Sequence, residues 1–135
     1  MKIFIHTMYY LPDFGSAPVL MDELARGLAA AGHEVEVVTT LPRRRGPEFR
    51  GLVASARIEG GVAVKRLWTN SAPHPLARLL AWNLYTAGAL LNLRTVRRGD
   101  VMFLRTPPLQ LGLPALFAKA FRGARVVVNV QDIHP

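Results

Sequence analysis

The chain has 135 residues, of which half are apolar and 19% are charged, and it contains no cysteine. This length fits one globular domain and excludes two full ones, while the composition excludes a disordered chain and a polytopic membrane protein. Without cysteine there are no disulfides, thiolate nucleophiles or cysteine-based zinc sites. The 17 basic and 9 acidic residues give a net charge of +8, which favours an anionic partner of unspecified kind.

The first forty residues predict a strand, a helix and a second strand. The first strand is the apolar run Lys2–Thr7, which is too short for a signal peptide, so we expect a cytoplasmic chain. The helix covers Ser16–Ala31, with Ser16 as N-cap and an apolar stripe through Leu20, Leu24 and Leu28. Glu34–Thr39 is the second strand, and this order predicts parallel pairing.

The remaining chain continues the alternation of strands and helices. Five strands and three helices in total predict an α/β fold with a doubly wound, mostly parallel, Rossmann-like sheet. Residues 1–135 would form one domain that is truncated after the fifth strand, because no helix follows to cover that strand. The predicted elements are a loop at Leu41–Gly61, strands at Gly61–Leu67, Val101–Leu104 and Ala124–Val130, and helices at Leu76–Arg98 and Leu109–Phe121.

Three loops should meet at the ligand-binding crevice of such a sheet, namely residues 8–16, 105–110 and 131–135. The first loop brings Gly15 and Ser16 to a helix N-terminus, where unpaired amides favour a phosphate. The alternative is that both residues form only a turn and a cap. The glycine spacing of a dinucleotide-binding loop and a Walker loop are both absent.

Asp132 follows the last predicted strand and could act as a base or orient a sugar hydroxyl. The alternative is that Asp132 caps a following helix. His6 and His134 are lone histidines, which are weak indications of catalysis, and no spacing of His or carboxylate residues suggests a metal site.

The apolar segment Leu76–Leu93 has two open interpretations. It could lie at a membrane surface, with Trp82 and Tyr85 at the headgroup level and arginines on anionic lipid. It could equally be a core helix that packs against the sheet. Nucleic-acid binding is not expected, because the run Arg43–Arg45 has no interleaved aromatic residues for stacking.

Several segments together resemble the N-terminal domain of glycosyltransferase family 4, in particular the bacterial sugar transferases of O-antigen and exopolysaccharide synthesis. The resemblance covers the whole chain. It rests on Met1-Lys2-Ile3, Tyr9-Tyr10-Leu11-Pro12-Asp13-Phe14-Gly15-Ser16-Ala17, Leu24-Ala25-Arg26-Gly27-Leu28, Gly32-His33-Glu34-Val35-Glu36-Val37-Val38-Thr39, Thr106-Pro107-Pro108-Leu109 and Asp132-Ile133-His134-Pro135.

The resemblance implies one half of a GT-B architecture, with the C-terminal donor-binding domain absent from this chain. It implies sugar transfer with retention of configuration, from a nucleotide sugar to a lipid-linked glycan, without a metal or other cofactor. Gly15 and Ser16 would bind the donor phosphates, and Asp132 would line the cleft as base or positioning residue.

We further expect Tyr10, Arg105, Thr106 and His134 to line the cleft or contact the acceptor, although His134 replaces the aromatic residue usual in the family. The chain would work in the cytoplasm, peripherally at the inner face of the membrane, and the fragment alone would be inactive. The alternative is a non-catalytic Rossmann-like domain that binds a membrane surface or a protein partner.

Overall fold

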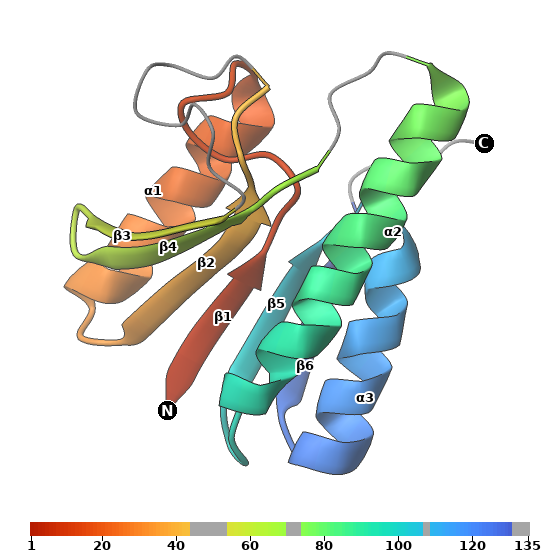
Figure 1. The fold of residues 1–135 in the computed structure, drawn as a ribbon. Coiled ribbons are helices and arrows are strands. Elements are labelled where there is room, and N and C mark those ends of the chain that lie inside the picture. Colours follow the sequence, from red (N-terminus) through yellow and green to blue (C-terminus); the bar gives the residue numbers. More distant parts are fainter. Residues whose placement is uncertain (44–53, 70–73, 107–108, 131–135) are drawn as a thin grey trace.

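The computed structural model describes residues 1–43, 54–69, 74–106 and 109–130. Six strands form one sheet in the order β3-β4-β2-β1-β5-β6, and all neighbours are parallel except β3 and β4 (Figure 1). The predicted fold class is therefore confirmed. The strands are β1 (Lys2–His6), β2 (Glu34–Thr40), β3 (Ala54–Glu59), β4 (Val62–Leu67), β5 (Val101–Arg105) and β6 (Arg125–Asn129).

Helices cover the two faces of the sheet in different halves (Figure 1). On one face, α1 packs on β1, β2 and β4 around a core that includes Ile5, Met21 and Val37. On the other face, α2 and α3 enclose a second core that includes Phe4 and Met102. The helices are α1 (Ser16–Ala30), α2 (Pro75–Asn92) and α3 (Gly112–Arg122), with short 3₁₀ turns η2 (Leu93–Thr95) and η3 (Leu109–Leu111).

The sixth strand is a correction, because β3 lies within the segment predicted as a loop. β3 is an edge strand that pairs antiparallel with β4, and its Ile58 is 80% exposed, so the strand lacks the apolar run of a buried one. A signal was nevertheless present. Gly60 and Gly61 both have positive φ, at 58° and 81°, as a two-residue hairpin turn of type I′ requires.

Helix α1 has the predicted length, but its N-cap differs and only part of the predicted apolar stripe is buried. Gly15 is the N-cap, and Ser16 is the first helical residue, without a capping hydrogen bond from its side chain. The buried face contains Met21 and Ala25, whereas Leu20 is 49% exposed. The predicted stripe is therefore confirmed at Leu24 and Leu28, which are partly buried against this core, and wrong at Leu20, because the buried face is centred on Met21 and Ala25.

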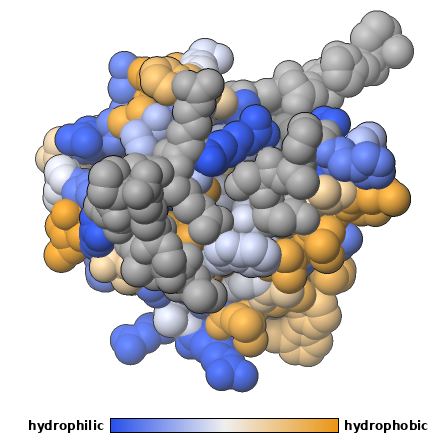
Figure 2. All heavy atoms as spheres, turned by 45° about the horizontal axis from the view of Figure 1, so that its top comes forward, coloured by the Kyte–Doolittle hydropathy of each residue, from blue (hydrophilic) through white to orange (hydrophobic). Residues whose placement is uncertain are grey.

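One side of helix α2 packs in the core, as one of the two interpretations of this segment predicted. It ends at Asn92 and not at Arg98, and the chain continues in the 3₁₀ turn η2. Tyr85 is fully buried and its hydroxyl donates to the Val38 carbonyl oxygen at 2.5 Å, so the predicted position of Tyr85 at a headgroup layer is wrong. The outer sides of α2 and α3 nevertheless expose apolar side chains, which appear orange on the right of Figure 2.

Candidate functional site

The strand order reverses between β1 and β5. The chain leaves β1 through α1 towards β2, and it leaves β5 through α3 towards β6 on the opposite side of the sheet. His6 ends β1 in register with Val38 of β2 and Leu104 of β5. A crevice at the carboxyl ends of the strands is expected at such a reversal, and the segments that follow β1 and β5 border it.

The connection from β1 to α1 is held in place by hydrogen bonds from two neighbouring strands, β2 and β4. The Thr40 hydroxyl at the end of β2 donates to the Met8 carbonyl oxygen at 2.7 Å. The buried guanidinium of Arg66 on β4 donates to the Leu11 carbonyl oxygen at 2.9 Å and forms a two-pronged ion pair with Glu59. This anchoring fixes the position from which the chain enters α1.

Gly15 stands at the exposed start of α1, as expected. Its φ of 131° is a conformation that residues with a side chain rarely adopt. No side chain of the described residues caps this helix end, and Pro18 in the first turn has no amide hydrogen. The amides of Ser16 and Ala17 therefore remain available to an anion at the positive end of the helix dipole. Their binding of a phosphate stays a prediction.

Arg43 is a further candidate, which the sequence analysis considered only as part of the basic run Arg43–Arg45. It lies just beyond β2, its guanidinium stacks on the Tyr9 ring at 4.4 Å, and its backbone amide donates to Asp13 Oδ1 at 3.0 Å. Partial burial raises the pKa of Asp13, although Arg43 partly opposes this effect. The signal for Arg43 was its position just beyond the end of the second strand, on the same edge as Gly15.

The other predicted site residues have different positions. Tyr10 is only 3% exposed, and its hydroxyl donates to Asp22 Oδ1 of α1 at 2.7 Å, so the side chain faces the core and Tyr9 takes the outer position. Arg105 ends β5 and is half-buried. The Thr106 amide donates to the Asn129 carbonyl oxygen at 3.1 Å, which ties β5 to β6. Asp132 and His134 lie outside the described residues.

Buried polar atoms without a hydrogen-bond partner gather at this edge of the sheet. Both ring nitrogens of His6, Asp13 Oδ2, Thr39 Oγ1 and Gln110 Oε1 have none within the described part of the chain. Each of these residues lies at, or just beyond, the carboxyl end of β1, β2 or β5. Folded proteins satisfy nearly all buried polar groups, so such a concentration marks a place where water or a ligand completes the bonding.

Burial dominates the electrostatics of His6. It lowers the pKa of the imidazole to about 4, although the Glu36 carboxylate on β2 partly opposes this by favouring the charged form. Burial alone would also raise the pKa of Glu36, but hydrogen bonds from Lys2 and Lys65 outweigh it and hold that pKa below its usual range. His6 is therefore a neutral imidazole at physiological pH.

This burial predicts an acid-sensitive fold. Between pH 6.5 and about 4 the unfolded chain binds a proton on His6 and the folded chain does not, so stability falls with pH by about 3 kcal/mol in that window. Above pH 6.5 the contribution is fully present. The His6→Leu variant should lose this dependence, whereas the variant of the exposed His33, His33→Leu, should keep it. Urea unfolding across the pH range measures both, and an unchanged slope in His6→Leu would contradict the assignment.

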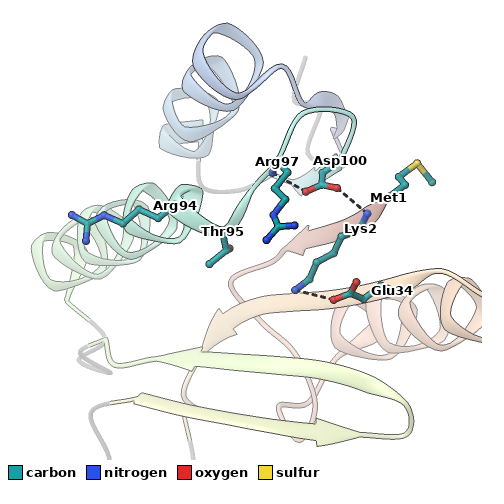
Figure 3. A pocket seen from close by; sticks show the side chains of 7 residues that line it. All are labelled: Met1, Lys2, Glu34, Arg94, Thr95, Arg97 and Asp100. Carbon is teal, nitrogen blue, oxygen red and sulfur yellow. Dashed lines mark hydrogen bonds and ion pairs between the residues drawn. The ribbon is translucent and has the colours of Figure 1, made fainter.

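A hollow of about 630 Å³ lies at the opposite edge of the sheet, beside the amino ends of β1, β2 and β5 (Figure 3). The side chains of Lys2, Glu34 and Asp100 in its lining have partners. Lys2 Nζ pairs with Glu36 at 2.6 Å and with Glu34 at 3.3 Å, while Asp100 accepts the backbone amides of Lys2 and Arg97 at 2.9 and 2.8 Å. These contacts fasten the start of β1, and the cavity therefore differs from the carboxyl edge, where polar atoms lack partners among the described residues.

The fold defines a Rossmann-like domain, and its topological switch point is the candidate ligand site. Residues 15–135 match the sequence model of the family described as "Glycosyl transferase 4-like domain", and the chain belongs to this family. It is 30% identical over 141 residues to an Escherichia coli K12 protein described as "Putative colanic acid biosynthesis glycosyl transferase WcaI". The alignment covers 98% of this chain and 34% of that protein, so the chain spans about a third of this relative's length.

Proposed function

We propose that this chain is the acceptor-side part of a retaining glycosyltransferase that moves a sugar from a nucleotide sugar to a lipid-linked glycan in cell-surface polysaccharide synthesis. A donor-binding domain in the same protein would close the cleft from the other side. The enzyme would act in the cytoplasm at the inner face of the membrane. Without the donor-binding domain the fragment would have no turnover.

The observation that carries this proposal is the chemistry of the carboxyl edge. Unpartnered buried polar atoms, the uncapped start of α1 and Arg43 lie along the ends of β1 and β2 in the described part of the chain. A nucleotide sugar could supply the missing hydrogen-bond partners. Its diphosphate would accept from the α1 amides and the Arg43 guanidinium, and its sugar hydroxyls would bond to the unpartnered polar atoms. The family membership and the WcaI relative support the same reaction class.

The reaction breaks the bond between the anomeric carbon and the diphosphate oxygen and forms a bond from that carbon to an acceptor oxygen. The bonding electron pair leaves with the nucleoside diphosphate, where negative charge builds up. Amides at Gly15 and Ser16, with Arg43 nearby, would stabilise this charge because they are fixed before the reaction. The acceptor hydroxyl gives up its proton, and Asp132 is our candidate for accepting it or for holding the acceptor.

The remaining residues would shape the acceptor side. Arg105 ends β5, and Thr106 and His134 follow β5 and β6 in the chain, where an acceptor would meet the donor sugar. The alternative function, a non-catalytic domain that binds a membrane or a partner, is favoured by the exposed apolar side chains of α2 and α3. It differs in predicting binding without sugar transfer.

Nuclear magnetic resonance tests the phosphate site. A nucleoside diphosphate titrated into the ¹⁵N-labelled complete gene product should shift the amide signals of Gly15, Ser16 and Ala17. The amides of Lys2 and Arg97, in the hollow at the opposite edge, serve as the internal control and should stay in place. Shifts confined to Lys2 and Arg97 would overturn the location of the site.

Removal of divalent metal should leave turnover unchanged. The charge on the leaving diphosphate would be neutralised by Arg43 and the α1 amides, so no cation is required for that role. The measurement is sugar transfer by the complete gene product before and after EDTA treatment, with the anomeric configuration of the product read by NMR. Activity lost with EDTA and restored by Mg²⁺ or Mn²⁺, or an inverted product, would contradict the proposal.

A further inference from the structure

The outward surfaces of α2 and α3 are apolar, the reverse of an ordinary surface helix. On α3 the buried positions are Pro114, Ala115 and Ala118, and the opposite side exposes leucines and phenylalanines three and four residues apart. On α2 the buried side holds Ala81 and Tyr85, and the opposite side exposes leucines. We call this surface the apolar helix face: Leu76, Leu79, Leu80, Leu84 and Leu91 of α2, and Leu113, Leu116, Phe117 and Phe121 of α3.

The two halves of the apolar helix face belong to neighbouring helices. α2 and α3 lie side by side on the same face of the sheet (Figure 1) and pack against each other. Phe117 and Phe121 stack on one another with their ring centroids 5.4 Å apart, and Phe121 is 75% exposed. Contiguous apolar surface of this kind on a water-soluble domain marks an interaction site.

The charged residues in the part of the chain that carries this face are almost all basic. Residues 70–131 contain seven arginines and one lysine but a single acid, Asp100, which is buried at the opposite end of β5 from the crevice and accepts backbone amides. Lys119 and Arg122 lie in the last turn of α3, and Arg94, Arg97 and Arg98 follow α2. An apolar surface with a basic border is complementary to anionic lipid headgroups over acyl chains.

We propose that the apolar helix face docks on a bilayer surface rich in anionic phospholipid. The side chains that enter the interface are the exposed leucines and phenylalanines, in place of Trp82 and Tyr85. None of the helices among the described residues has the length and hydrophobicity of a membrane span. In the proposed complex α2 and α3 lie along the membrane surface. The proposal rests on the proposed function and deepens it by naming the surface that would carry the enzyme to a lipid-linked acceptor.

A second copy of the chain would fit the apolar helix face less well than an anionic bilayer. A symmetric dimer across this face would bring two basic borders together, in a protein with a net charge of +8. An anionic bilayer instead attracts cations, and each exposed Lys or Arg near its surface contributes about 1 kcal/mol to the binding free energy. The charge pattern therefore selects the bilayer.

Vesicle co-sedimentation of the complete gene product tests this inference. The protein should bind vesicles of phosphatidylcholine with phosphatidylglycerol, and bind vesicles of phosphatidylcholine alone at least about tenfold more weakly. The double variant Leu116→Ser/Phe121→Ser should weaken binding to the anionic vesicles by about tenfold or more. The charge variant Lys119→Glu/Arg122→Glu should have an effect of similar size.

The matched control is Ile58→Ser, which removes an exposed apolar side chain from β3 at the far edge of the sheet and should leave binding unchanged. The serine variants should keep the wild-type melting temperature because the changed residues are exposed, whereas Lys119→Glu/Arg122→Glu should lower it by a few degrees, because it places two acids at the negative end of α3, and should remain folded. Wild-type vesicle binding by Leu116→Ser/Phe121→Ser, or a dimer that this variant dissociates, would overturn the proposal. Sugar transfer to a water-soluble acceptor should persist in the variants, so a failure here is distinct from a failure of the proposed reaction.

Discussion

Replacing Tyr85 by Ala is expected to lower the free energy of unfolding by about 4 kcal/mol. The ring is fully buried in the core beneath α2, together with Phe4 and Val38, so truncation leaves a cavity. It also leaves the Val38 carbonyl oxygen without the Tyr85 hydroxyl donor. A loss of this size is a large share of the about 5–15 kcal/mol that stabilises a typical domain. Urea unfolding followed by circular dichroism measures it.

Two further variants separate the loss of the Tyr85 hydroxyl from the loss of its buried ring. Tyr85→Phe removes only the hydroxyl and should cost about 1 kcal/mol. Leu80→Ala truncates a residue of the same helix that is exposed on the apolar helix face, and it should change the free energy of unfolding by less than about 0.5 kcal/mol. If Leu80→Ala destabilised the protein as much as Tyr85→Ala, the orientation of α2 on the sheet would be wrong.

Replacing Gly15 by Val is expected to reduce sugar transfer by about 100-fold or more, the usual effect of losing one fixed donor to a developing negative charge. At a φ of 131° a β-branched residue is strained, although the space beside Gly15 is open, with Pro18 Cδ 3.7 Å from the position that a Cβ would take. The strain shifts the first-turn amides away from the phosphate. The fall should be in kcat more than in KM, because the interaction is strongest in the transition state.

Gly27 provides the matched control for this variant. It lies in the interior of α1, is exposed, and has no atom near the position of a Cβ. Gly27→Ala should retain wild-type turnover and raise stability slightly, because alanine favours the helix by up to about 1 kcal/mol. Wild-type turnover in a folded Gly15→Val enzyme would exclude the start of α1 as the diphosphate site.

Strands buried on both faces could be predicted from the sequence, because burial requires near-continuous apolar runs, as in β1 and β5. Edge strand β3 could not be predicted from hydrophobicity, since its side chains face solvent and only Gly60 and Gly61 indicate its hairpin. The sequence also could not predict which side of α2 faces the core. Its outer side is as apolar as its inner side, and only packing shows that Tyr85 belongs to the core.

The site was predictable where backbone requirements dictate the residue. Gly15 at a helix start could be identified from the sequence, because it ends the loop between the first strand and the helical pattern that begins at Ser16. The positions of Tyr10 and Arg43 could not, since they depend on which partners in α1 and the first loop they meet, namely Asp22 and Asp13. The sequence also could not predict that the ring nitrogens of His6 lack hydrogen-bond partners among the described residues, because this depends on how the surrounding residues pack.

The most direct test of the central claim is sugar transfer by the complete gene product. A panel of radiolabelled nucleotide sugars, with a polyprenyl diphosphate-linked sugar as acceptor, should contain one donor whose label enters the organic-solvent fraction as nucleoside diphosphate is released. The Gly15→Val variant should transfer little of that label, and Gly27→Ala should transfer it normally. A folded protein that binds vesicles but moves no sugar from any donor in the panel would contradict the account and favour the non-catalytic membrane-binding domain.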